Sequence, residues 1–156
     1  MRLYFLLDEN ILYHAIRGVD PHDQPDETST RLVQTIVKVC HSVVIHDVLR
    51  VRYIKILQLL RFERPRHLSP AEFFKQVLER ADKRTFQYDA LPALPNGCGD
   101  VPREDEYLVQ AALLSHPILV TSDEALYNAL KNHPELGIEV LRPREALQRA
   151  QSTAAD

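Results

Sequence analysis

Three aspartates stand where the sequence could build a site for phosphoryl chemistry. Asp8 directly follows the apolar run Leu3–Leu7. Asp123 closely follows the run Ile118–Val120, and Asp105 lies in the helical stretch before it. Gathered carboxylates repel one another unless a cation lies among them, and hard divalent ions such as Mg²⁺ prefer oxygen ligands. Such an ion activates water and stabilises a phosphoryl transition state, so the three acids predict a metal site.

Each acid alone also has a purely structural interpretation. An aspartate between a strand and a helix commonly caps the helix, which fits Asp8 and Asp123. An acid in a first helical turn, such as Asp105, is favoured by the helix dipole. The joint pattern is more specific, because both strand-end acids must fall on the same edge of a parallel sheet.

Short apolar runs that alternate with helical patterns predict how these acids are positioned. An α/β fold follows, a three-layer α/β/α sandwich with a mainly parallel central sheet. The predicted strands are residues 3–7, 43–45, 118–120 and 138–141. The predicted helices are residues 10–17, 30–40, 47 to about Pro65, 70–81, 104–115, 124–131 and a last helix from Pro143, with loops at 20–26 and 86–102.

Local signals mark several helix ends and the limits of the domain. Gly18 is expected to stop the first helix, and Ser69 followed by Pro70 is a strong helix start. Cys40 falls on an apolar helix face and is expected in the core. No repeat is found, so we expect one domain over residues 1–150 and a flexible tail over residues 151–156.

Composition excludes several classes of protein. The chain has 156 residues and a formal net charge of −3, which argues against holding long nucleic acid by bulk positive charge. Its four glycines form no phosphate-binding loop, and two cysteines make no disulfide scaffold. No run approaches the ~20 apolar residues of a membrane span. We therefore expect a cytoplasmic protein without membrane contact.

One segment is strongly basic. Residues 50–66 contain six basic side chains against the single acid Glu63; they are Arg50, Arg52, Lys55, Arg61, Arg64 and Arg66. These charges are suited to RNA phosphates, and Tyr53 or Phe62 is near enough in sequence to stack on a base. The alternative is a solvated helix face whose charges are paired elsewhere.

Other polar residues near the predicted strand ends have weaker claims. His14 and His46 are candidate general bases, although histidine is commonly a hydrogen-bonded structural residue. Thr121 and Ser122 could position a water or support a metal, and Thr121 could equally cap the turn. No Ser-His-Asp order or GxSxG elbow appears.

The chain resembles the PIN-domain nucleases in an ordered set of motifs. These are Leu6-Leu-Asp-Glu-Asn-Ile-Leu12, Asp105-Glu-Tyr-Leu-Val-Gln-Ala111, Val120-Thr-Ser-Asp-Glu-Ala-Leu126 and Val140-Leu-Arg-Pro-Arg-Glu-Ala-Leu147. The resemblance implies Mg²⁺- or Mn²⁺-dependent cleavage of single-stranded RNA, with Asp8, Asp105 and Asp123 as catalytic metal ligands. It also implies supporting roles for Asn10, Thr121, Ser122 and Glu104, often a homodimer, and in many bacterial members a toxin paired with an antitoxin protein.

One position departs from the resemblance. Where the family has its second acid, usually Glu, this chain has Arg52, and no acid occurs between Asp47 and Glu63. A guanidinium among carboxylates could take the charge role of the metal and leave the site inactive. Alternatively, Arg52 points toward substrate phosphate, and one of four other acids completes the metal shell. Those acids are Asp47, Asp89, Asp100 and Glu104.

The sequence thus predicts a metal-dependent endoribonuclease with Arg50, Arg52 and Lys55 as RNA contacts. The alternative is a degenerate, non-catalytic PIN-like module that binds RNA or a protein partner. Phosphoryl transfer from a strand-end aspartate is a weaker third class, because Asp8-Glu-Asn10 lacks a DxD pairing.

Overall fold

The strand β1 (Tyr4–Leu7) lies at the centre of a five-stranded sheet in which every strand is parallel. The spatial order is β3-β2-β1-β4-β5, so the order reverses between β1 and β4. At such a reversal, the crossover connections leave the two strands in opposite directions and open a crevice at their carboxyl ends. The other strands are β2 (Ser42–His46), β3 (Arg84–Gln87), β4 (Ile118–Val120) and β5 (Val140–Leu141).

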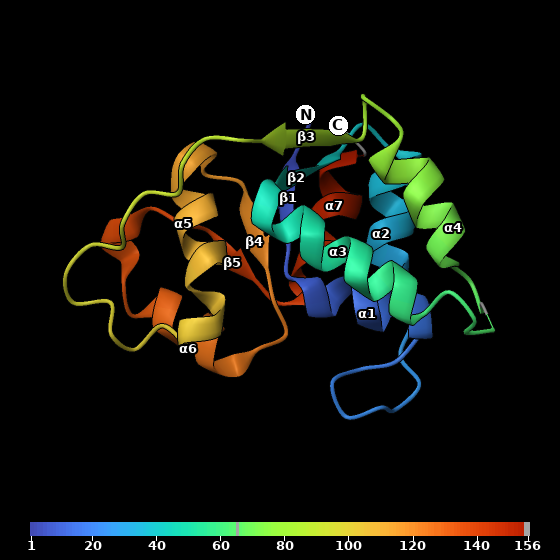
Figure 1. Cartoon of the computed structure of the whole chain (residues 1–156), viewed down its shortest axis with the longest axis horizontal. Coiled ribbons are helices and arrows are strands. Elements are labelled where there is room, and N and C mark those ends of the chain that lie inside the picture. The colour runs from blue at the N-terminus through green and yellow to red at the C-terminus, as the bar shows by residue number, and fades with distance from the viewer. Residues whose placement is uncertain (65, 155–156) are drawn as a thin grey trace.

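Helices cover both faces of this sheet in the computed structural model, which describes residues 1–64 and 66–154. Figure 1 shows α5 and α6 on one side and α1 to α4 on the other, with α7 against α2. The predicted α/β/α sandwich is therefore confirmed, with a fully parallel sheet. The helices are α1 (Glu9–Arg17), α2 (Thr28–Lys38), α3 (Asp47–Leu59), α4 (Pro70–Phe73), α5 (Glu106–Ser115), α6 (Glu124–Lys131) and α7 (Pro143–Ala154).

The apolar runs form the core because their strands are covered on both faces. Residues Phe5, Leu6 and Leu7 of β1 are fully buried, and so are Val43 and Ile45 of β2. Burying each such side chain contributes roughly 1.5–3 kcal/mol. This continuous burial holds the ends of the central strands in fixed places.

Two predicted helix ends are confirmed. Gly18 ends α1 in the left-handed conformation with a φ of 66°, which a side chain would strain. The Ser69 hydroxyl accepts a hydrogen bond of 3.0 Å from the backbone N–H of Glu72. The α-helix that follows is shorter than predicted, since a π-helical turn (Phe74–Leu78) replaces its second half.

The segment predicted to be a loop from Phe86 onward begins inside a strand, β3. β3 pairs only with β2 at the edge of the sheet, and its residues are mostly half-buried or exposed. A short edge strand that contains Arg84 and Gln87 has no apolar run, so its pattern gave no signal. The prediction for Cys40 was also wrong: α2 ends at Lys38, and Cys40 is exposed.

The last described helix, α7, continues to Ala154 and so includes residues assigned above to a flexible tail. Residues 155–156 of that tail, and Pro65 near the expected end of α3, lie outside the described residues; α3 itself ends at Leu59. No helix in the described part of the chain combines the length and apolar character needed to span a bilayer.

Candidate active site

The three aspartates predicted as metal ligands come from three elements beside the reversal of the strand order. Asp8 follows β1 and caps α1, and Asp123 follows β4 and caps α6. Asp105 ends a 3₁₀ turn (Arg103–Asp105) at the start of α5. The negative charges of Asp8 and Asp123 both act on the carboxyl of Asp105, so the three form one acid cluster.

Asp8 is buried, with 1% of its surface exposed. Its carboxylate accepts hydrogen bonds of 2.9 Å from the Thr121 hydroxyl and 3.4 Å from the backbone N–H of Asn10. Burial raises its pKa to about 6, although the hydrogen bond from Thr121 acts in the opposite direction. Thus Asp8 both caps α1 and takes up a proton unusually easily for a carboxyl group.

Asp105 is buried, and its Oδ2 has no hydrogen-bond partner among the described residues. Burial raises its pKa to about 7, and the charges of Asp8 and Asp123 act in the same direction. Near neutral pH the Asp105 carboxyl is therefore still partly protonated. A bound cation would offset the repulsion between the carboxylates of Asp8, Asp105 and Asp123.

Thr121 connects the two strand-end acids. Its buried hydroxyl donates to Asp8 and accepts a hydrogen bond of 3.0 Å from the backbone N–H of Asp123. One carboxylate oxygen of Asp123 accepts from the N–H groups of Ala125 and Leu126, at 2.9 Å and 3.2 Å. Asp123 and Thr121 therefore cap the turn and helix as considered above, and they also belong to the candidate site.

The other supporting residues lie farther from the buried centre. Asn10 contributes its backbone N–H to Asp8, while the residue itself is exposed. Glu104 is exposed on the 3₁₀ turn and adds negative charge near Asp105. Ser122 is half-buried between Thr121 and Asp123 and lines a neighbouring cavity.

The chemistry of these residues fits a hard divalent cation. All three offer oxygen ligands, and two buried oxygens from residues two positions apart, Asp105 Oδ2 and the Tyr107 hydroxyl, have no partner among the described residues. Nevertheless, no group of three His, Cys, Asp or Glu side chains within residues 1–64 and 66–154 has the geometry of a metal site.

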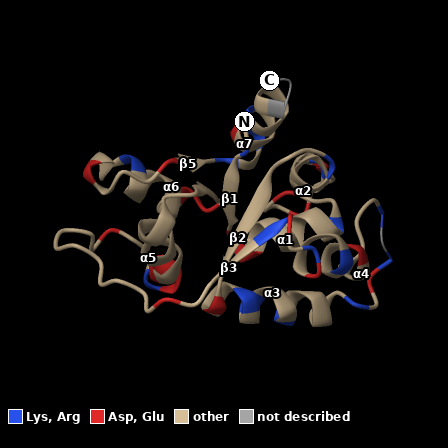
Figure 2. Cartoon of the chain, turned by 90° about the horizontal axis from the view of Figure 1, so that it is seen from above, with Lys and Arg blue, Asp and Glu red and all other residues tan. Residues whose placement is uncertain are grey.

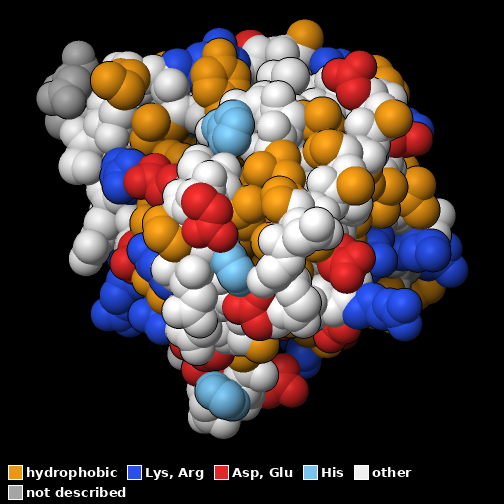
Figure 3. Space-filling view, turned by 90° about the vertical axis from the view of Figure 1, so that its left-hand side faces the viewer, with side chains coloured by type: hydrophobic (Ala, Val, Ile, Leu, Met, Phe, Trp, Pro, Cys, Tyr) orange, Lys and Arg blue, Asp and Glu red, His pale blue; other side chains and the backbone are white. Residues whose placement is uncertain are grey.

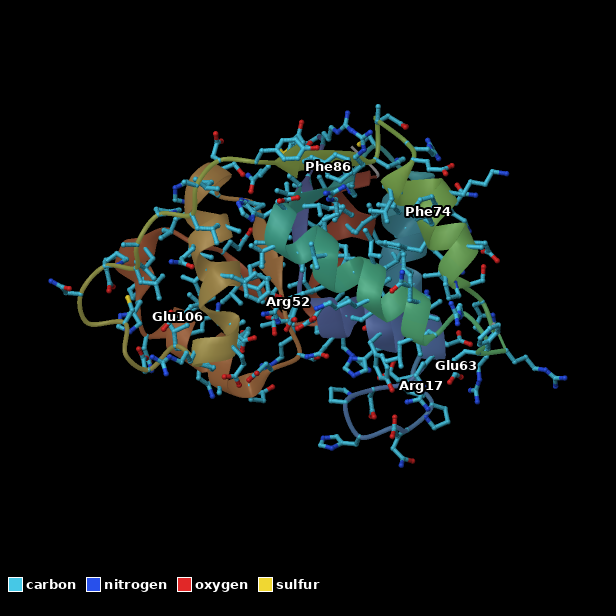
Figure 4. All side chains as sticks on the ribbon, viewed as in Figure 1. Arg17, Arg52, Glu63, Phe74, Phe86 and Glu106 are labelled. Carbon is cyan, nitrogen blue, oxygen red and sulfur yellow. The ribbon has the colours of Figure 1, made fainter. Side chains whose placement is uncertain are left out.

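Arg52 neither faces solvent freely nor forks onto Asp8 and Asp123. One N–H donates to the Glu9 carboxylate at 2.9 Å, and the guanidinium carbon lies 4.2 Å from the centre of the Tyr107 ring. Figure 4 shows Arg52 between α3 and α5. The side chain keeps 36% of its surface exposed, so it stands beside the acid cluster with donors left for another anion.

The basic segment supplies further cations on α3, where Figure 2 shows Lys and Arg spaced along the helix. Arg50 pairs with Asp47 at 3.2 Å, whereas Lys55 is exposed and makes no ion pair within the described residues. The stacking prediction was wrong for Tyr53, which is fully buried and donates its hydroxyl to the Leu7 carbonyl. Phe62 is 86% exposed and remains accessible to a base.

Two of the other candidate acids, Asp47 and Asp100, are paired elsewhere. Asp47 pairs with Arg50, Asp100 accepts from His133 at 2.7 Å, and Asp89 is exposed with its carbonyl bound to His46. His46 also accepts from the Val48 N–H, so both of its ring nitrogens have structural partners.

Two residues beside the acids were not identified from the sequence. Glu9 binds Arg52, and Tyr107 stacks on it. Both lie within two residues of a predicted metal ligand, and this closeness in sequence could have identified them as site residues. Their partner Arg52 lies more than 40 positions away from each, so nothing local indicated the contact.

Comparison with known proteins supports the fold. A solved structure of a PilT N-terminus (PIN) domain protein from the hyperthermophilic archaeon Sulfolobus solfataricus P2 is similar, with a TM-score of 0.50. The two chains are 13% identical over 96% of this chain and 93% of the other. No family model and no curated protein matches the sequence. The chain therefore has a PIN-like fold.

Proposed function

We propose that this chain is a Mg²⁺- or Mn²⁺-dependent endoribonuclease that hydrolyses phosphodiester bonds of single-stranded RNA. One observation carries the proposal: three carboxylates from separate elements share the edge of the sheet where its order reverses, and two have raised pKa values. Perturbed acids at such an edge are typical of a catalytic site. The PIN-like fold gives independent support.

Asp8, Asp105 and Asp123 would hold the cation. When bound, a divalent ion supplies Lewis-acid stabilisation of negative charge on a phosphoryl group and lowers the pKa of water. The Thr121 hydroxyl binds both the Asp8 carboxylate and the Asp123 backbone N–H, and so fixes their relative positions.

Arg52 is suited to bind the substrate phosphate next to the acids. Glu9 and the Tyr107 ring fix the plane of its guanidinium, and its remaining N–H groups can bind two phosphate oxygens. Arg50 and Lys55 lie on the same helix and would contact neighbouring phosphates.

Cleavage of a fluorescent single-stranded RNA with Mg²⁺ or Mn²⁺ tests the proposal. Asp8→Asn should lower the rate at least about 100-fold, because it removes a charged ligand from the acid cluster. Asp47→Asn is the matched control, since Asp47 also follows a strand but pairs with Arg50 in the open. Equal cleavage by wild type and Asp8→Asn would mean a contaminating nuclease and end the proposal.

A second candidate is a non-catalytic PIN-like module that binds RNA or a protein partner. The observation that favours it is Arg52, which stands where the resemblance expects an acid and already pairs with Glu9. Calorimetric titration with MnCl₂ separates the two candidates. Tight binding by the native chain supports the nuclease, whereas binding that appears only in Arg52→Glu supports the module.

The remaining expectations from the sequence stay predictions. These are a toxin role, an antitoxin partner, a homodimer and a cytoplasmic location.

A further inference from the structure

A cavity of about 400 Å³ opens beside the acid cluster. Ser122 and Glu124, on either side of Asp123, form one wall. The other lining residues come from α1, the loop of residues 19–27, the start of α2 and the turn into α7. In Figure 1 this loop projects below α1. Segments far apart in the sequence thus meet around one hollow at the candidate active site.

The loop that forms this cavity is held in shape by hydrogen bonds. The Gly18 N–H donates to the His14 carbonyl at 2.8 Å, and the Asp26 N–H donates to the Gly18 carbonyl at 3.0 Å. The Asp20 carboxylate accepts from the N–H groups of His22 and Gln24, at 2.8 Å and 2.9 Å. The cavity is therefore formed before any ligand arrives, which lowers the entropic cost of binding.

The acids of the cavity already have partners, and this determines which ligand suits it. Asp20 binds its own turn, and Asp26 accepts from the Thr28 N–H at 2.8 Å. Glu124 accepts two hydrogen bonds from Arg142, at 3.0 Å and 2.8 Å. By contrast, Arg144 is exposed and makes no ion pair within the described part of the chain. Asp20 and Asp26 keep their negative charges, and Arg144 is the lining guanidinium that no carboxylate pairs among the described residues, so Arg144 is the group that can bind a phosphate.

The apolar surfaces of the cavity complement this charge. Its walls include the flat rings of His14 and His22 beside Val19, Pro21 and Pro143. Burial lowers the pKa of His14, so at neutral pH its imidazole is uncharged and presents one donor or acceptor to a ligand. Flat walls, a neutral polar ring and a free guanidinium together match a base and its phosphate.

We propose that this cavity binds one unpaired nucleotide of RNA beside the acid cluster. This inference rests on the proposed function for its place in the reaction, but its binding step does not require cleavage. A cavity of this volume accommodates a nucleoside. A base can enter only when it is unpaired and unstacked, so the cavity would select single strands by shape.

Nucleotide binding is measured by NMR of the histidine side chains, in EDTA so that no cleavage occurs. The probes are the four nucleoside 5′-monophosphates, with inorganic phosphate as a separate arm. Nucleotides should shift the resonances of His14 and His22 in a saturable way, while those of His116 and His133 stay fixed. His14→Gln and His22→Gln provide the assignments.

Arg144→Ala should weaken nucleotide binding about tenfold, the loss expected for one charge-assisted contact. Arg31→Ala on α2 is the matched control, because Arg31 is also exposed but lies outside the cavity, and it should change nothing. The inference is overturned if no saturable shift occurs, if Arg144→Ala has no effect, or if phosphate alone reproduces the shifts. If the native chain shows these shifts but does not cleave RNA with Mg²⁺ or Mn²⁺, only the nuclease proposal is contradicted.

Discussion

At the scale of single residues, the Thr121 hydroxyl is the contact on which the acid cluster depends. It is fully buried, donates to Asp8 and accepts from the backbone of Asp123. Because both of its partners are polar and shielded from water, removing it leaves a carboxylate oxygen and an N–H unpaired.

Thr121→Val should therefore lower the free energy of unfolding by about 1–3 kcal/mol, although valine has nearly the same shape. Urea unfolding followed by circular dichroism measures this loss. Thr121→Ser, which keeps the hydroxyl and removes a methyl group, should lose about 1 kcal/mol. If the serine variant is the less stable of the two, packing rather than the hydrogen bonds fixes this position.

The raised pKa values of Asp8 and Asp105 predict how stability depends on pH. Both values, about 6 and about 7, lie above the unfolded value of 3.8. Between roughly pH 4 and pH 7 the folded chain binds more protons than the unfolded chain, so stability falls as the pH rises through this window. For Asp8 alone the loss is about 3 kcal/mol.

Thermal unfolding in EDTA should show this fall between pH 5 and pH 7.5, and Asp105→Asn should flatten it. Adding MnCl₂ at pH 7.5 should restore the lost stability, since a cation favours the charged carboxylates. The same profile in wild type and Asp105→Asn would mean that other groups set the pH dependence.

At the scale of elements, Lys83 ties the end of α2 to the edge strand. It is buried, and its ammonium group donates to the carbonyls of Ile36, at 3.0 Å, of Val39 and of His41, at 3.3 Å. These carbonyls lie at and just after the end of α2, where no helical N–H reaches them. Lys83 directly precedes β3, so one side chain links both elements.

Lys83→Met keeps the apolar stem and removes the charge, and it should cost about 2–4 kcal/mol in urea unfolding. Lys38→Met, at the exposed end of the same helix, should cost under about 0.5 kcal/mol. Similar losses in both variants would show that burial of the Lys83 stem, not its hydrogen bonds, matters.

Elements whose signal is local were predictable from the sequence, and contacts across the fold were not. The apolar runs of β1, β2 and β4 indicated strands because both faces of the sheet are covered. The edge strand β3 draws its stability from pairing with β2 and from Lys83, which leaves no pattern in its own residues. Asp8, Asp105 and Asp123 could be predicted as a set because each stands next to a local signal, a strand end or a helix start. The contact of Arg52 with Glu9 and Tyr107 joins distant parts of the sequence, so only the structure shows it.

At the scale of the whole molecule, the net charge of −3 is the sum over two regions of different charge. Figure 3 shows Asp, Glu and His among uncharged side chains on the face around α5 and α6, with Lys and Arg gathered toward its margins. The basic residues of α3 lie along one helix instead (Figure 2). A chain with this distribution should hold RNA through few phosphate contacts, since the rest of its surface repels the polymer.

Salt dependence measures the number of those contacts. If Arg50, Arg52 and Lys55, with or without Arg144, each bind one phosphate, the slope of log K against log salt concentration should be about −2 to −3 for single-stranded RNA. Lys55→Ala should reduce this slope by about 0.7, whereas Lys38→Ala should leave it unchanged. Fluorescence anisotropy of a labelled oligonucleotide in EDTA gives both values. A much steeper slope, or one that Lys55→Ala does not alter, would place the RNA on a surface other than α3.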